Sequence, residues 1–221
     1  MNTLRTLIFA VLGLSLNVAV ASPIIIDFSG QPDDVVSELT YEEMGISLTI
    51  SAWTTSYNSD QDQLEPWTLV DNGFGVSVRD NGIGVKSSAN DGSKIDGGNS
   101  GDYSTDPDEG LLLQFSEAVN IHDFLLSSLS DDDDVNFSIA YFLSPTQIEI
   151  SDVFVDAPAL SYPEDLFFVP GSAIGTAFMV WVDGASDGVR LKDVAFSKVP
   201  EPSTWMLMLF ASLMMAVKRR K

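Results

Sequence analysis

Side chains with oxygen ligands gather in one stretch of the sequence, and their chemistry is that of a cation site. In a Gly- and Ser-rich segment the acidic and amide residues follow each other closely: Asp91, Asp96, Asn99, Asp102, Asp106, Asp108 and Glu109. Ca²⁺ accepts about six to eight such oxygen ligands. The segment lacks the spacing of an EF-hand loop, so two interpretations stay open, a calcium-binding loop and a solvated loop without a cation.

A short repeat precedes this segment. Asp71-Asn-Gly-Phe-Gly-Val76 recurs nine positions later as Asp80-Asn-Gly-Ile-Gly-Val85. Asn-Gly after Asp favours tight turns, because both residues tolerate positive φ angles. We therefore expect two turns around a short strand at 76–78. Calcium-binding β-rolls repeat with a similar period, but they need more copies and a different glycine pattern.

Aromatic side chains offer a second kind of chemistry, the stacking of sugar rings against a flat apolar face. Trp53 and Trp181 continue strand-like apolar runs, so we expect them in the core. Trp67 follows Glu65-Pro66, and Tyr57 and Tyr103 fall in loop-like segments, which favours the surface for these three. Trp67 and Tyr103 are the candidate residues for ligand binding.

The sequence offers little for catalysis. It has no cysteine, and His122 is its single histidine, so a thiol nucleophile and a Cys-based or multi-His metal centre are excluded. No Gly-x-Ser-x-Gly motif accompanies His122, which we expect near the start of a strand. A glycosidase needs only a pair of carboxylates, but any acidic domain offers such pairs. We therefore predict a protein that is not an enzyme, with a secreted glycan-active enzyme as the weaker alternative.

The negative charge belongs to the middle of the chain. Of the 32 acidic residues only Glu201 lies outside residues 22–198, whereas five of the 11 basic residues do. That stretch therefore carries 31 acidic residues against 6 basic ones, a net charge of −25. Such a surface argues against nucleic-acid binding, which needs a basic face. The four aspartates at 131–134 predict a solvated turn. Their carboxylates repel each other, and a bound cation would relieve that repulsion.

The first 21 residues have the pattern of a secretory signal peptide. Arg5 gives a short positive region, an apolar run covers 7–20, and Ala19-Val20-Ala21 forms a small-residue cleavage site. A buried helix would need a polar face, which this run lacks. We predict export by the Sec machinery and cleavage after Ala21.

The other end of the chain combines prolines, an apolar run and a basic cluster. Val199-Pro-Glu-Pro-Ser203 precedes Trp205, the apolar run extends over 205–217, and Lys218-Arg-Arg-Lys221 ends the chain. We predict a single transmembrane helix whose basic end stays cytoplasmic, which puts the domain on the periplasmic side of the inner membrane. As a helix this run covers roughly 20 Å, short of the ~30 Å hydrocarbon core, and snorkelling by Lys218 and Arg219 narrows the gap.

These three parts, in this order, resemble the PEP-CTERM sorting signal. The residues that carry the resemblance are Val199, Pro200, Glu201, Pro202 and Ser203, then Trp205 and the apolar run, then Lys218, Arg219, Arg220 and Lys221. The resemblance covers about the last two dozen residues. It implies a Gram-negative bacterium, recognition and cleavage by an exosortase, and transfer to the cell surface or extracellular matrix. Proteins of this group are often associated with exopolysaccharide and biofilm formation.

Between the two ends the sequence predicts strands throughout. Apolar and polar residues alternate at 46–53, 135–141, 147–155 and 189–196, and continuous apolar runs lie at 24–28, 111–115, 166–169 and 178–182. Residues 22–198 are therefore predicted to form one all-β domain, a β-sandwich or jelly roll, with an up-and-down barrel as the alternative. We expect the first strand, 24–28, to pair with the last, 189–196.

The order of these segments over about residues 23–197 resembles carbohydrate-binding-like sandwich domains of other PEP-CTERM proteins. Binding modules of this kind often hold a structural Ca²⁺ between the first and last strands, and the resemblance makes Asp27 and Asp193 its candidate ligands. We therefore expect an exported, non-enzymatic surface or matrix protein that binds exopolysaccharide. A structural or adhesive surface protein without a sugar site is the alternative.

Overall fold

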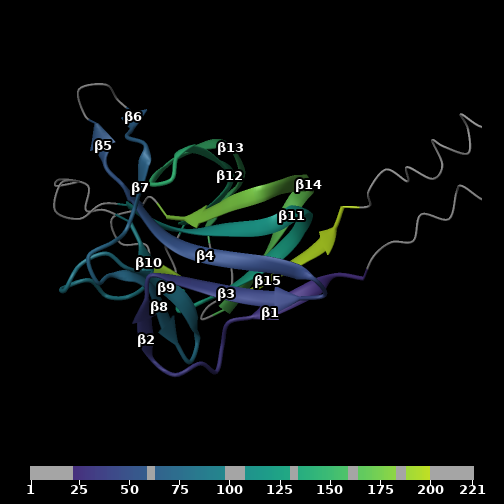
Figure 1. Ribbon diagram of the computed structural model, residues 1–221, viewed down its shortest axis with the longest axis horizontal. Helices are drawn as coiled ribbons and strands as arrows, with labels where there is room; N and C mark the ends of the chain where they lie inside the picture. Colours follow the sequence, from purple (N-terminus) through teal and green to yellow (C-terminus); the bar gives the residue numbers. More distant parts are fainter. Residues whose placement is uncertain are drawn as a thin grey trace, which may run out of the picture.

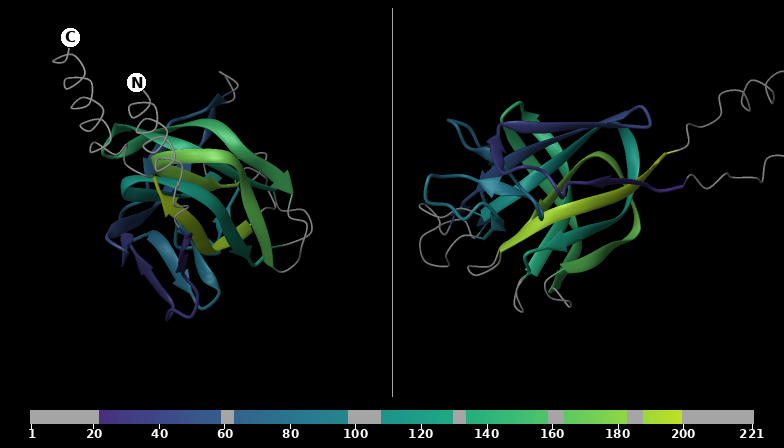
Figure 2. Two further views of the ribbon diagram at one scale, coloured as in Figure 1. Left: turned by 90° about the vertical axis from the view of Figure 1, so that its right-hand side faces the viewer. Right: turned by 90° about the horizontal axis from the view of Figure 1, so that it is seen from below.

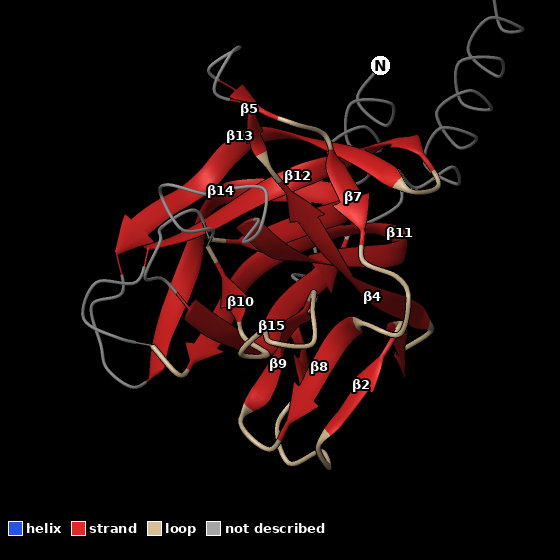
Figure 3. Cartoon of the chain, turned by 90° about the vertical axis from the view of Figure 1, so that its left-hand side faces the viewer, coloured by secondary structure: helices blue, strands red, loops and turns tan. Residues whose placement is uncertain are grey.

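The computed structural model describes residues 22–58, 63–97, 108–129, 134–158, 164–182 and 188–199. Within these ranges every regular element is a strand, as Figure 3 shows. Among the same residues, no helix is long and apolar enough to cross a membrane. The predicted signal peptide at 1–21 lies outside the described residues, as do Pro200–Ser203, Trp205 and the basic cluster at 218–221.

The alternating segments form the expected strands, with some differences in extent (Figure 1). The strands are β1 Ile24–Asp27, β2 Asp34–Val36, β3 Glu38–Glu43, β4 Ile46–Thr55, β5 Tyr57–Asn58, β6 Gln63–Leu64, β7 Trp67–Leu69, β8 Gly75–Arg79, β9 Gly82–Lys86, β10 Ile95–Asp96, β11 Asp108–Ser127, β12 Asp134–Ser144, β13 Gln147–Pro158, β14 Glu164–Trp181 and β15 Gly188–Lys198.

One antiparallel sheet of 13 strands contains almost all of these elements. Its order is β2-β8-β9-β15-β11-β14-β12-β13-β7-β4-β3, with β1 and β10 paired to β15. The long strand β11 changes partners along its length: its first part pairs with β4, and its second part with β15. It thereby joins the two layers of an all-β, sandwich-like domain (Figure 2).

The pairings also close a ring of strands, because β4 at one end of the path pairs with β11 in its middle. The ring runs from β11 through β14, β12, β13 and β7 to β4 and back to β11. Each of its strands contributes to a small core that contains Trp53, Trp67, Leu112, Ala140, Ile148, Ala177, Met179 and Trp181. Since side chains alternate along a strand, the opposite faces of β4, β11, β12 and β14 supply part of the larger core.

Phenylalanine side chains connect several strands within the larger core. The ring of Phe137 stacks on Phe124, with centroids 5.3 Å apart, and on Phe178, with centroids 5.6 Å apart. Phe115 meets Phe196 edge to face at 4.8 Å, which connects β11 to the last strand. These contacts connect β11, β12, β14 and β15.

The expected pairing of the first and last strands is confirmed. β1 and β15 are antiparallel, with Ile24 opposite Phe196 and Asp27 opposite Asp193, and both strands reach the same end of the domain in Figure 2. The expected strand around 76–78 is also confirmed as β8, with a turn on each side.

Two expectations about the strands were wrong. His122 does not start a strand but lies inside the 20-residue β11, whose register shifts between Gln114 and Val119. The segments 166–169 and 178–182 are not separate strands, because β14 runs through both.

Candidate functional site

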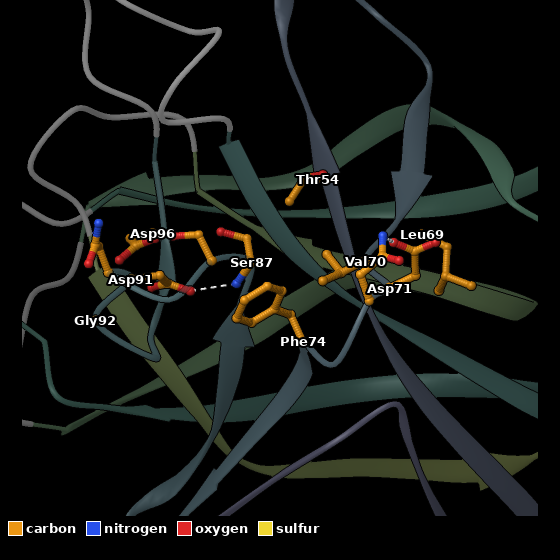
Figure 4. A pocket seen from close by; sticks show the side chains of 12 residues that line it. Thr54, Leu69, Val70, Asp71, Phe74, Ser87, Asp91, Gly92 and Asp96 are labelled. Carbon is orange, nitrogen blue, oxygen red and sulfur yellow. Dashed lines mark hydrogen bonds between the residues drawn. The ribbon is translucent and has the colours of Figure 1, made fainter.

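A cleft of about 620 Å³ opens where the segments 70–74 and 87–92 meet beside the end of β4. Figure 4 shows its walls: Asp91, Asp96 and Ser87 lie on one side, Leu69, Val70 and Asp71 on the other, and Phe74 between them. The full lining is Thr54, Leu69, Val70, Asp71, Asn72, Phe74, Ser87, Ser88, Asn90, Asp91, Gly92 and Asp96. A half-buried aromatic ring is thus surrounded by amides, hydroxyls and carboxylates.

The first Asp-Asn-Gly sequence builds one wall as a tight turn. Asn72 and Gly73 have φ angles of 61° and 88°, the conformation that Asn and Gly adopt most readily. Gly75 follows with φ 155°, and a Cβ there would lie 2.3 Å from the carbonyl oxygen of Val36. The turn therefore depends on its glycines, and it holds Phe74 against the core with its ring facing the cleft.

The opposite wall is a loop that Asp91 organises. Its carboxylate accepts hydrogen bonds from the backbone N–H of Ser87 at 2.6 Å and of Ser93 at 2.9 Å. The Nζ of Lys86 donates to the backbone carbonyl oxygen of Asp91 at 2.9 Å. Because these contacts close the loop on itself, Ser87, Asn90 and Asp91 line the cleft from a fixed backbone.

Three carboxyl groups converge at the base of this wall. One oxygen from each of Asp91, Asp96 and Glu109 lies within 4.8 Å of the others, and the backbone N–H of Asp96 donates to Glu109 Oε2 at 3.3 Å. Asp91 and Asp96 line the cleft, whereas Glu109 is 1% exposed and lies beneath it.

The surroundings of Glu109 favour its protonated form. Burial raises the pKa of this carboxyl far above its ordinary value, and the hydrogen bond to Asp96 and the negative charges of Asp96 and Asp91 raise it further. A hydrogen bond from Ser87 acts in the opposite direction. At neutral pH Glu109 therefore keeps a proton, and a divalent cation bound by these oxygens would have to displace it.

A second hollow of about 300 Å³ also borders the 71–74 turn. Its lining includes Val35, Ser37, Glu38 and Ser51. It shares Leu69, Val70, Asp71, Asn72 and Phe74 with the cleft. The turn thus borders both hollows, and together they form one binding region, which we call the groove.

The structure corrects the position of Trp67. This side chain is 1% exposed, and its ring packs edge to face on Trp181 with centroids 5.6 Å apart. Its strand β7 pairs with both β4 and β13 and so closes the ring of strands around the Trp67 side chain. The loop-like sequence before Trp67 predicted a surface position instead. Trp67 is therefore unable to stack on a sugar from the surface.

Of the other aromatic residues considered, two tryptophans lie in the core and one tyrosine lies outside the described residues. Trp53 and Trp181 are 1% and 4% exposed, which confirms that they belong to the core. Tyr103 lies outside the described residues, and so do Asp131 to Asp133 in the aspartate run. The aromatic residue at the groove is Phe74, which the sequence presented only as part of a turn.

Asp27 and Asp193 lie opposite each other in the β1–β15 pair, as expected from their strands. Partial burial raises the pKa of Asp193, and the charges of Asp123 and Asp27 add to this. The N–H of Ser29 donates to Asp27 Oδ1 at 2.8 Å. Among the described residues, however, the carboxyl groups that come together in a set of three are Asp91, Asp96 and Glu109, so Asp27 and Asp193 have no third carboxylate at ligand distance.

His122 makes a local contact between two strands. Its Nε2 lies 2.9 Å from Ser197 Oγ across the β11–β15 pair, and neither residue lines the groove. Asp123, the next residue, has a pKa raised by partial burial. This contact is separate from the cleft and its carboxyl groups.

No protein-family model matches the sequence, and no curated protein matches it. Function is therefore inferred from the chemistry of the groove and from the two terminal segments.

Proposed function

We propose that this chain is an exported, non-enzymatic surface or matrix protein that binds polysaccharide in the groove. In this proposal the domain is a jelly-roll binding module, and the PEP-CTERM-like tail passes it through an inner-membrane intermediate to the cell surface. An exosortase and the Sec machinery are its partners during export, and exopolysaccharide is its partner afterwards.

The observation that carries the binding proposal is the composition of the cleft. Phe74 offers an apolar face for the C–H side of a sugar ring, and Asn72, Asn90, Ser87 and Ser88 offer donors and acceptors for its hydroxyls. The cleft volume of about 620 Å³ falls within the roughly 300–1,000 Å³ typical of small-ligand sites. A purely structural surface protein has no need of this combination.

A binding role is favoured over hydrolysis by the position of the acid. A glycosidase acid must reach the glycosidic oxygen, and it is typically the carboxyl group with the raised pKa. At this cleft the carboxyl group with the raised pKa is Glu109, which lies under the cleft and does not line it.

The export proposal is supported by the arrangement of the tail. β15 ends at Lys198, so the Val199 to Ser203 motif begins directly after the last strand. An exosortase would therefore meet the motif at the end of the domain where β1 also begins (Figure 2).

A panel of immobilised bacterial and plant polysaccharides tests the binding proposal. The full chain, kept soluble in detergent, should bind at least one glycan, and both Phe74→Ala and Asn90→Ala should weaken that binding about tenfold, equivalent to about 1.4 kcal/mol. Asn90 is exposed, so its variant keeps the core intact if Phe74→Ala loosens it. Phe142→Ala, an exposed aromatic residue outside the groove, is the matched control. Absence of binding to every glycan, or equal binding by all variants, would contradict the proposal.

Calcium is proposed as a structural ligand, as the resemblance implies for Asp27 and Asp193. The donor set of Asp91, Asp96 and Glu109 also suits Ca²⁺ in kind, since it consists of carboxylate oxygens. Thermal unfolding in millimolar Ca²⁺ and in chelator tests this, and calcium should raise the melting temperature. Asp193→Asn should abolish that rise if calcium binds at Asp27 and Asp193, and Asp96→Asn should abolish it if calcium binds at Asp91, Asp96 and Glu109. Equal melting temperatures would exclude a structural calcium.

A further inference from the structure

The charges along the groove are of one sign. Asp71, Asp91 and Asp96 line the cleft, and Glu38 lines the second hollow. The lining of both hollows contains no lysine or arginine among the described residues. A ligand in the groove therefore lies among carboxylates, in a domain whose net charge is already strongly negative.

The nearby basic side chains are held elsewhere. Lys94 Nζ donates to the backbone carbonyl oxygens of Ser128 at 2.8 Å and of Gly188 at 2.7 Å. Lys86 Nζ donates to the backbone of Asp91, and Arg79 pairs with Asp33 at 2.9 Å. These contacts position loops and strands, and none of the three cations lines either hollow.

We infer that the polysaccharide bound in the groove carries amino groups, as a polymer of unacetylated amino sugars does. The inference rests on the proposed function and names the class of glycan. A protonated amine gains charge-assisted hydrogen bonds to Asp71, Asp91 or Asp96, which are roughly twice as strong as neutral ones. A uronic acid or a sulfated sugar is repelled by the same carboxylates, and a neutral sugar gains only the neutral hydrogen bonds.

The shape of the groove fits a chain of sugar residues. Phe74 and Asp71 border both hollows, so an aromatic face and a carboxylate lie at the junction between the two. Neighbouring residues of one chain can then occupy the two hollows, with an amine near Asp71 and another near Asp91 or Glu38. A free amine or a single monosaccharide would use only part of this arrangement.

Calorimetric titration with oligosaccharides of one linkage tests the inference. The set is β-1,4-linked glucose, N-acetylglucosamine, glucosamine and a uronic acid of equal length, added to the full chain in detergent. The titration is run at a pH at which the glucosamine amine is protonated. We expect the glucosamine oligomer to bind about tenfold or more tightly than its acetylated and neutral counterparts, and the uronic acid oligomer to bind most weakly.

Charge-removing variants separate a site from general attraction to an acidic protein. Asp71→Asn and Glu38→Gln should each weaken glucosamine binding about five- to tenfold and leave binding of the acetylated oligomer unchanged. Glu149→Gln removes the same charge from the exposed face of β13, outside both hollows, and should leave glucosamine binding within about twofold.

Three other outcomes would overturn the inference, and they differ in what they say about polysaccharide binding. If Glu149→Gln weakens binding as much as Asp71→Asn, the attraction is non-specific and the inference is overturned. If the neutral, acetylated or uronic acid oligomer binds as tightly as glucosamine, the inference fails and the proposed polysaccharide binding stands. If no oligosaccharide and no glycan of the panel binds, the proposed function fails with it.

Discussion

At the scale of single residues, the chain places one carboxyl group where it cannot readily ionise. Glu109 is buried under the cleft beside two other carboxyl groups, and it is hydrogen-bonded to Asp96. A protonated Glu109 can donate a hydrogen bond to Asp96 and adds no third negative charge beside Asp91 and Asp96. The cost of burying an acid here is offset by neutralising it.

This arrangement predicts a specific pH dependence. A carboxyl group whose pKa is raised by folding stabilises the folded state fully below its ordinary pKa of 4.5, and that contribution is lost as pH rises toward the raised value. Relative to Glu109→Gln, the native protein should therefore lose stability between pH 4.5 and 8, by up to about 1.4 kcal/mol per pH unit.

Urea unfolding of both proteins across this pH range measures the difference, since the glutamine amide keeps the donor that faces Asp96. Glu149→Gln, an exposed site, should track the native protein at every pH. Parallel curves for the native protein and Glu109→Gln would show that Glu109 ionises normally.

The candidate site was partly predictable at this scale. Asp91, Asp96 and Glu109 stood out in the sequence as oxygen ligands, and three of that larger group do converge. The sequence did not show which three, because Asp91 and Glu109 belong to a loop and a strand that only tertiary packing brings together. Trp67 was misjudged for the same reason: its burial comes from ring closure by β7, which local pattern does not reveal.

At the scale of elements, β11 and β14 determine how the layers join. Gly110 on β11 lies opposite Trp53 on one side and Trp181 on the other. A Cβ at Gly110 would lie 2.6 Å from Met179 Cε and 3.0 Å from Trp181 Cβ. The glycine thus leaves room for the side chains of Met179 and Trp181, which belong to the small core inside the ring of strands.

Gly110→Ala should therefore destabilise the domain by about 1–3 kcal/mol through overpacking. Thermal and urea unfolding measure the effect, which Gly92→Ala should not reproduce. A Cβ at Gly92 would come no closer than 3.8 Å to Asp96 Oδ2, an ordinary contact. If the Gly110→Ala protein were as stable as the native one, the small core inside the ring of strands would be loosely packed at this position.

The strands themselves were well predicted, because alternation of apolar and polar residues follows directly from the period of a strand. The lengths of β11 and β14 were not. The polar residues Ser116 and Glu117 interrupt the apolar pattern of β11 and suggest an end, whereas the strand shifts register there and continues into the other layer. Local patterns do not distinguish a strand end from an irregularity within a strand.

At the scale of the whole molecule, an acidic domain is joined to an apolar, basic tail. The last strand ends at Lys198, whose Nζ pairs with Glu117 at 2.9 Å, and the proposed sorting motif begins with the next residue. The acidic domain and the proposed sorting signal are therefore adjacent in the sequence but differ in composition and charge.

Deleting residues 199–221 should redirect the protein without unfolding it, since the last strand, β15, ends at Lys198. Fractionation of cells that express the full and truncated chains should show loss of the truncated form from the surface fraction. A variant with Lys218 to Lys221 changed to alanine distinguishes the basic cluster from the motif. Equal amounts of the full and truncated forms at the surface would refute the sorting proposal.

Hydrogen exchange of the full chain with and without its glycan tests whether polysaccharide binds in the groove. Binding there should slow amide exchange at 71–74 and 87–96, the two walls of the cleft, and should change little along β1 and β15. Slowing confined to β1 and β15, or no slowing anywhere at a saturating concentration of a glycan that binds, would contradict it.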